Sequence, residues 1–139
     1  MNSFQTIKVV RFGHVDPAGI AYFPRIYDFV HEVFEELWEV HVGQRYDRLI
    51  LGRRLGFPLV HSEVDFLDPL HFGDRLTVRV TCSKLGRSSL GLRYRFVRDD
   101  TLCVDARMTT VCVDMDGLKP VPIPAEFRPS FEQILESAP

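Results

Sequence analysis

The sequence predicts an α+β fold in which one long helix covers one face of an antiparallel sheet. Apolar residues recur at helical spacing between Pro24 and His41, and most of the chain after residue 58 alternates between apolar and polar side chains. A strand, a long helix and then four or five strands is not the alternation of strands and helices that a parallel sheet requires. With 139 residues, 45% hydrophobic and 26% charged, we expect residues 1–139 to form a single domain.

The first half of the chain predicts a strand, a loop and two helices. Residues 5–12 are typical of a short strand, and the glycines and proline of residues 13–19 are typical of a loop. A helix is expected over residues 24–41, because a proline suits its first turn and acidic side chains occupy the face opposite the apolar one. A shorter helix is expected over residues 44–52, before Gly56-Phe57-Pro58 ends it.

The second half predicts strands joined by tight turns. Alternating apolar and polar residues mark four runs, at residues 60–66, 75–82, 90–96 and 102–115. With the first strand they predict a sheet of five to six meandering strands. The apolar parity switches near Thr109-Thr110, which predicts a bulge or a strand buried on both faces. A short C-terminal helix is expected, capped by Ser130 with Gln133 three residues later.

Charge and cysteine content exclude several classes of protein. Lys and Arg total 17 against 19 Asp and Glu, giving a net charge of −2, so nucleic-acid binding is disfavoured. The three cysteines, Cys82, Cys103 and Cys112, form no C-x-x-C pair, and an odd count favours reduced, buried thiols over a disulfide framework. Because there is no apolar signal core and no run of 18 uncharged apolar residues, we expect no membrane association and a cytoplasmic location.

Several common catalytic motifs are missing. The turn Gly86-Arg87-Ser88-Ser89 lacks the second glycine of a G-x-S-x-G elbow, and neither G-x-G-x-x-G nor a phosphate-binding loop occurs. His31 and Glu35 are one helical turn apart and could share a metal, but H-E-x-x-H is incomplete and no further ligands are suggested. We therefore expect no metal and no cofactor.

The segment between Arg11 and Pro24 is the strongest candidate for chemistry. Asp16 lies in a loop bounded by glycine and proline, immediately before the long helix. The first N–H groups of a helix have no intrahelical partner and carry partial positive charge, so this position could hold an oxyanion. From spacing alone, Asp16-Pro17 could equally form and cap a turn.

The residues of this segment carry a resemblance to a known family. Phe12 to Ile20 read F-G-H-V-D-P-A-G-I and Tyr22 to Arg25 read Y-F-P-R, which resembles the signature of the 4-hydroxybenzoyl-CoA thioesterase group of the hotdog-fold superfamily. Later segments are similar to the same family, so that the resemblance spans roughly residues 7–115: Pro58 to His61, Pro69 to Asp74 and Lys84 to Ser89.

The resemblance implies a hotdog fold, a helix wrapped by an antiparallel sheet, paired into a homodimer that assembles into a homotetramer, with active sites between subunits. It implies hydrolysis of an aromatic, hydroxybenzoyl-CoA-like, or other small acyl-CoA to the free acid and CoA. Asp16 matches the catalytic carboxylate, acting as nucleophile or general base, and Phe23 matches the position whose backbone N–H polarises the thioester carbonyl. The resemblance also implies substrate contacts at Tyr22, His31 and His61, and CoA contacts at Lys84, Arg87 and Ser88.

Two departures from the family leave alternatives open. His31 stands where the 4-hydroxybenzoyl type has an acidic residue that accepts the phenol hydroxyl, so the acyl group could differ. Gly86-Arg87-Ser88 stands where that type has adjacent basic residues. A hotdog thioesterase or hydratase acting on a carrier-protein thioester, with Asp28 or Glu32 on the helix as its carboxylate, is one alternative. A non-enzymatic acyl-CoA-binding module is another, because a fold does not fix a function.

Overall fold

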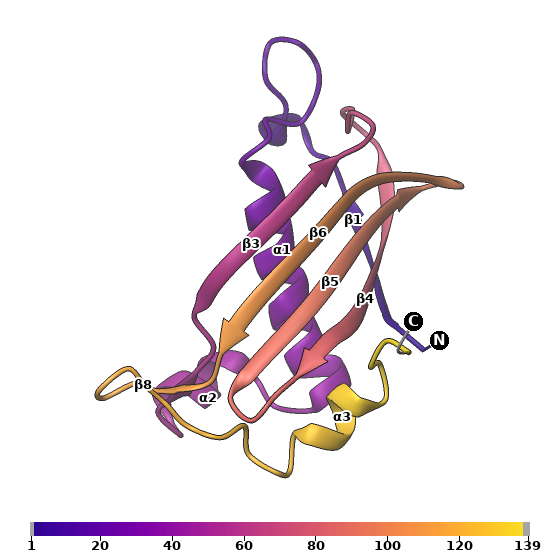
Figure 1. Ribbon diagram of the computed structural model, residues 1–139. Helices are drawn as coiled ribbons and strands as arrows, with labels where there is room; N and C mark the ends of the chain where they lie inside the picture. Colours follow the sequence, from indigo (N-terminus) through magenta and orange to yellow (C-terminus); the bar gives the residue numbers. More distant parts are fainter. Residues whose placement is uncertain (1, 138–139) are drawn as a thin grey trace.

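A computed structural model describes residues 2–137 and confirms the predicted α+β architecture (Figure 1). A five-stranded antiparallel sheet has the strand order β1-β4-β5-β6-β3, and helix α1 lies across one of its faces. The strands are β1 (Phe4–Val9), β3 (Leu59–Phe66), β4 (Arg75–Leu85), β5 (Ser89–Arg98) and β6 (Thr101–Val111). No helix in the described part of the chain is long and apolar enough to span a membrane.

The long helix forms where the periodicity predicts it, but its last part is wound differently. Helix α1 covers Arg25–Glu36 and continues without a break into a π-helix, η2, over Leu37–Val42. The N–H of Gly43 donates to the carbonyl of Trp38, five residues earlier, at 2.8 Å. Gly43 then ends the helix in the left-handed region at φ 85°, which glycine adopts without steric strain. The second predicted helix is confirmed as α2, Tyr46–Leu51.

The expectation of meandering strands is correct only for β4, β5 and β6. Strand β3 precedes β4 in the chain but pairs with β6 at the opposite edge of the sheet. Helix α1 starts beside the end of β3 and runs to the β1 side of the sheet, where the His41 ring lies 6.1 Å from that of Phe4. The segment that contains α2 and β2 then carries the chain to the lower end of β3 at the far edge (Figure 1). Residues 67–74, which we call the crossing loop, therefore carry the chain from β3 back to β4, past the N-terminal end of α1.

The parity switch near Thr109-Thr110 coincides with an irregularity in the β3–β6 ladder. Leu59 pairs with Thr110 and His61 pairs with Thr109, so the extra residue, Val60, belongs to β3. The predicted single strand over 102–115 is also divided. Strand β6 ends at residue 111, and the chain continues as β7 (Val113–Asp114) in a small sheet with β2 (Leu55–Gly56) and β8 (Lys119–Pro120).

The C-terminal helix starts earlier than predicted. Helix α3 covers Arg128–Glu132, so Ser130 lies inside it and does not cap it. Pro129 fits the first turn, where its missing N–H breaks no hydrogen bond. After the helix, the Cys82 N–H donates to the Ile134 carbonyl at 2.8 Å, and this contact ties the C-terminal segment to the edge of β4.

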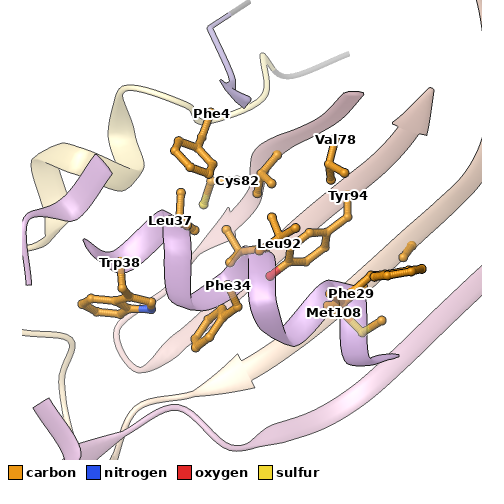
Figure 2. Close-up of a cluster of buried hydrophobic side chains, with 14 of the residues drawn as sticks. Phe4, Phe29, Phe34, Leu37, Trp38, Val78, Cys82, Leu92, Tyr94 and Met108 are labelled. Atoms are coloured by element: carbon orange, nitrogen blue, oxygen red, sulfur yellow. The ribbon is translucent and has the colours of Figure 1, made fainter. Parts of the chain in front are cut away.

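The core lies between α1 and the sheet (Figure 2). The buried face of α1 contributes Phe29, Val33 and Phe34, and the sheet contributes the inward side chains of β4, β5 and β6. All but a few per cent of the surface of these side chains is removed from water, and burial stabilises each by about 1.5–3 kcal/mol. The core therefore fixes the direction of α1, and with it the position of the loop that precedes the helix. The sheet side of this core consists of Leu76, Val78, Val80, Leu90, Leu92, Tyr94, Phe96, Val104, Ala106 and Met108.

Candidate active site

The loop that carries Asp16 is held by its own backbone. The Asp16 N–H donates to the Ile20 carbonyl at 2.9 Å, and the Gly19 N–H donates back to the Asp16 carbonyl at 2.9 Å. Oxygen Oδ1 of Asp16 accepts the N–H of Ala18 at 2.8 Å. Within residues 2–137 no cation or other donor contacts the carboxylate. The side chain is half-buried, so the turn interpretation and the catalytic interpretation are compatible: one oxygen shapes the turn and the other stays free.

The start of α1 presents one free backbone donor. The N–H of Arg25 donates to the Tyr22 carbonyl at 2.8 Å and that of Ile26 donates to the Phe23 carbonyl at 3.2 Å. Pro24 has no N–H. Among the described residues, the N–H of Phe23 has no acceptor. This donor lies at the positive end of the α1 dipole and follows the Asp16 loop directly.

The crossing loop lies against the Asp16 loop and pairs with it. The Ala21 N–H donates to the Leu70 carbonyl at 2.7 Å, and Ile20 and His71 form an isolated antiparallel bridge. The Tyr22 N–H donates to the His14 carbonyl at 2.9 Å, which closes the base of the loop. The position of Asp16 relative to α1 is thus set by two loops together.

Two hollows lie along α1 on the side of the helix that faces β3. The first, about 230 Å³, lies between the Asp16 loop, β3 and the crossing loop, and is lined by apolar side chains that include Phe23, Ile26 and Phe66. The second, about 430 Å³, lies further along the helix and is lined by Tyr27, His31 and other, mainly apolar, side chains. Volumes of this order match small-molecule sites, which are mostly apolar with few polar groups.

The three predicted substrate residues occupy different places. Tyr22 lines the first hollow, its ring 5.4 Å from that of Phe23. His31 lines the second hollow and is also near Glu35, with Nε2 and Oε1 3.5 Å apart. His61 faces the other way: it pairs with Thr109 on the outer face of the sheet, and its Nε2 lies 3.1 Å from Oε1 of Glu63. One chain therefore does not bring His61 to Asp16.

The predicted CoA-binding residues lie at the end of the sheet opposite the Asp16 loop. Arg75 begins β4 opposite Val9, beside the Asp16 loop. Lys84 comes nine residues later on β4, a separation of about 30 Å at roughly 3.3 Å per residue. Arg87 and Ser88 form the β4–β5 turn, at the lower end of the sheet in Figure 1, whereas the Asp16 loop is at the upper end. A single protomer cannot assemble these groups around one thioester.

Sequence reasoning missed Arg98. This residue ends β5 and its guanidinium contacts Asp68, Asp74 and the Pro69 carbonyl, all on the crossing loop. Arg98 lies on a strand whose apolar and polar side chains alternate, so its sequence context predicts only a side chain that points into solvent. Asp74 lies in the segment from Pro69 to Asp74 that carries the family resemblance, and no local signal connects it to a residue more than 20 positions away.

Fold and site together define a hotdog protein with a carboxylate loop in front of its helix. Residues 10–131 match the family model described as "Thioesterase-like superfamily", and the chain belongs to this superfamily. It is 30% identical over 125 residues, 90% of this chain and 84% of the relative, to the 1,4-dihydroxy-2-naphthoyl-CoA hydrolase of Nostoc punctiforme.

Solved structures agree with this assignment. A 1,4-dihydroxy-2-naphthoyl-CoA thioesterase from Synechocystis superposes with a TM-score of 0.84 at 26% identity, covering 94% of this chain and 96% of that one. A gentisyl-coenzyme A thioesterase superposes with a TM-score of 0.83 at 26% identity, covering 92% of this chain and 99% of that one. The resemblance found in the sequence is confirmed for the superfamily. Because these relatives are named for other acyl groups, the 4-hydroxybenzoyl subgroup stays a prediction.

Proposed function

We propose that this protein is an acyl-CoA thioesterase that hydrolyses an aromatic acyl-CoA to the free acid and CoA. One observation carries the proposal: the half-buried Asp16 carboxylate, with one free oxygen, lies in the loop that leads directly to the unpaired N–H of Phe23 at the start of α1. A thioesterase needs an attacking oxygen and a donor for the developing oxyanion, and these two groups supply both.

The chemistry can follow two routes that use the same residues. As a nucleophile, Asp16 attacks the thioester carbonyl, the C–S bond breaks, and water then hydrolyses the resulting anhydride. As a general base, Asp16 takes a proton from water, and the water oxygen attacks instead. In both routes the N–H of Phe23 donates to the carbonyl oxygen as it becomes negative. A CoA thiolate leaves with little assistance from an acid, so no metal or cofactor is required.

The acyl group is proposed to be an aromatic ring placed in the hollows between α1 and the β3 side of the sheet. Both hollows are lined mainly by apolar and aromatic side chains, and the relatives carry the names of naphthoyl and gentisyl thioesters. His31, exposed in the second hollow, can donate a hydrogen bond to a ring hydroxyl or accept one from it.

His31→Phe is expected to lower kcat/KM for hydroxylated aryl-CoA at least tenfold and to leave benzoyl-CoA hydrolysis nearly unchanged. An equal loss for both substrates would contradict this role.

The CoA-binding residues are proposed to come from a second copy of the chain. Strand β3 is an edge strand, and it exposes Leu59 (49%), Val60 (58%) and Phe66 (51%). Apolar edge strands of this kind pair with another strand. Pairing of β3 with β3 of a second copy runs antiparallel, so the lower end of one sheet approaches the upper end of the other. Lys84, Arg87 and Ser88 of one protomer would then serve the Asp16 of its partner, in a homodimer that can assemble further to a homotetramer.

The decisive experiment measures release of free CoA from a panel of aryl- and alkyl-CoA substrates. Asp16→Asn is expected to lower kcat at least 100-fold with unchanged thermal unfolding. Asp28→Asn is the matched control, because Asp28 is an exposed carboxylate on the first turns of α1 and is the catalytic candidate of the carrier-protein or hydratase alternative. Loss of activity in Asp28→Asn alone would favour that alternative. Binding of acyl-CoA without turnover in the wild type would favour a binding module.

A further inference from the structure

Arg98 joins the end of β5 to three points of the crossing loop. One Nη atom donates to the Pro69 carbonyl at 3.0 Å and to Oδ2 of Asp74 at 2.9 Å, and the other donates to Oδ2 of Asp68. Oδ2 of Asp74 also accepts the His71 N–H at 2.8 Å. The guanidinium side chain is 24% exposed and that of Asp74 is 17% exposed, so the pair is partly shielded from water.

The crossing loop passes this constraint to the reactive loop through backbone hydrogen bonds. Leu70 lies between Pro69 and His71, and its carbonyl accepts the N–H of Ala21 at 2.7 Å. His71 bridges to Ile20, whose carbonyl accepts the N–H of Asp16. Arg98 is therefore connected to Asp16 through the crossing loop and the backbone contacts of Leu70 and His71 with the Asp16 loop.

The crossing loop needs an external anchor. Its other backbone contacts tie only its ends, with the Leu67 N–H donating to the Cys103 carbonyl at 2.8 Å and the Gly73 N–H donating to the Val10 carbonyl at 2.8 Å. Leu70, 6% exposed, is the one side chain of residues 67–74 that is buried in the core, and Phe72 is 60% exposed. Burial therefore holds the loop at a single point and does not fix Asp68 or Asp74. A planar guanidinium with several fixed donors can hold two carboxylates and a carbonyl at once, which a lysine ammonium cannot do in the same geometry.

We propose that Arg98 is a positioning residue for hydrolysis: by holding the crossing loop, it places the Asp16 loop against the N-terminus of α1. The inference rests on the proposed thioesterase function for its kinetic consequence. Its structural consequence, the coupling of Arg98 to the backbone of Ala21, does not depend on any activity. Misplacing a reacting group by about 1 Å can lower a rate by about 100-fold, so a modest shift of the loop is sufficient.

The kinetic test compares Arg98→Gln with Arg93→Gln. Arg93 lies on the same strand and makes a bidentate pair with Asp105, at 2.9 and 2.6 Å, but touches neither loop. Both variants lose an arginine that is paired with carboxylate. Arg98→Gln is expected to lower kcat at least tenfold, with KM within about twofold, whereas Arg93→Gln keeps kcat within about twofold. Arg98→Lys is expected to recover only part of the loss.

Hydrogen exchange of the backbone amides separates positioning from general destabilisation. In Arg98→Gln the N–H of Ala21 and of Asp16 is expected to exchange at least tenfold faster, while amides in the middle of β5 keep the wild-type rate. In Arg93→Gln the Ala21 amide is expected to be unchanged. Equal acceleration of all amides in Arg98→Gln, or equal loss of kcat in the two variants, would overturn the proposal. A wild type without thioesterase activity would overturn the proposed function but leave the exchange result to judge the coupling.

Discussion

The two ends of the sheet differ in how completely their side chains are buried. At the lower end, where Figure 1 labels α3, the π-helix η2 packs against that helix. Trp38 of η2 is fully buried, and its ring centre lies 5.1–6.3 Å from the centres of five other rings. At the upper end, the Asp16 loop and the crossing loop leave aromatic rings in water, with Phe12 77% and Phe23 63% exposed. We call these the closed end and the open end. The rings around Trp38 belong to Phe34, Tyr46, Phe57, Phe127 and Phe131.

The contrast follows from what each end has to do. The closed end gathers the π-helix, α2 and the C-terminal segment around one indole. Apolar burial holds it together, supplemented by hydrogen bonds such as that between His41 Nε2 and the Ser130 carbonyl at 2.7 Å. The open end keeps a carboxylate oxygen and a backbone N–H free for a substrate, so it cannot bury them. It is held instead by polar contacts between loops. We therefore expect substitutions in the aromatic cluster around Trp38 to change stability and those at the open end to change activity.

Trp38→Ala should produce the largest change in stability. Truncating a fully buried tryptophan removes apolar contact and leaves a cavity, which costs about 3–5 kcal/mol. Urea unfolding monitored by far-ultraviolet circular dichroism measures this change. Trp38→Phe should cost much less, because it also removes the indole Nε1, which is buried without a hydrogen-bond partner in the described structure. Below the unfolding transition, kcat should stay within about twofold in both variants. A large fall in kcat would contradict the separation of the two ends.

The complementary change at the open end removes a single backbone donor. Phe23→Pro lacks the N–H proposed to stabilise the oxyanion, and losing one such donor costs about 2.7–4 kcal/mol of transition-state stabilisation, or at least about 100-fold in kcat. Phe23→Ala keeps the N–H and should retain kcat within about threefold. Thermal unfolding of both variants checks that the start of α1 is intact. If Phe23→Ala is as impaired as Phe23→Pro, the side chain and not the backbone carries the effect.

The long elements could be predicted from the sequence, because periodicity reports burial directly. The helix from Pro24, the strands β4 and β5 and the buried cysteines all follow from local patterns. Strand order could not be predicted in the same way. Placing β3 beside β6 depends on where the segment after the long helix, with α2 and β2, carries the chain, which is a property of the packed molecule and not of any window of residues.

At the open end, too, some site residues could be predicted from the sequence and others could not. Asp16 and Phe23 lie seven residues apart in one segment, so a single motif can contain both. Arg98 and its partners on the crossing loop are more than 20 residues apart, and an arginine on an alternating strand is normally a solvated side chain. The division of Asp16 and Lys84 between opposite ends of one chain also requires the three-dimensional structure, since sequence similarity assigns roles without assigning subunits.

The ion pair of Arg93 with Asp105, in the middle of the sheet between the two ends, makes a contribution to stability that depends on pH. The Arg93 guanidinium, hydrogen-bonded to Asp105, holds the pKa of that carboxyl below its usual value. A lowered pKa in the folded state stabilises the protein above the unfolded pKa of about 4, and the contribution is lost as the pH falls through the folded value. Asp105→Asn should be less stable than the wild type by about 2 kcal/mol at pH 7, the contribution typical of a hydrogen bond to a charged group. By pH 3 the difference should shrink.

Urea titrations at several pH values measure this difference, and kcat at pH 7 should be unaffected because the pair touches neither end. A difference between Asp105→Asn and wild type that is the same at pH 3 as at pH 7 would show that packing, not ionisation, is the source.

The smallest expected effect is a difference in how often the two ends open locally in the unsubstituted protein. Cys103 accepts the Leu67 and Asp68 N–H groups with its carbonyl and so lies beneath the open end, whereas Cys82 and Cys112 lie toward the closed end. All three are fully buried, and burial raises the pKa of Cys82 and Cys112 to about 11. An alkylating reagent therefore reaches each thiol only when its surroundings open.

Because the open end is held by polar loop contacts and the closed end by apolar packing, Cys103 should react roughly tenfold faster than the other two in the native state. Mass spectrometry of peptides from a time course of alkylation measures the three rates separately. In Arg98→Gln the rate at Cys103 should rise further, while Cys82 and Cys112 keep their rates. Equal rates for all three thiols would mean that they become accessible only on global unfolding, and that the two ends open as one unit.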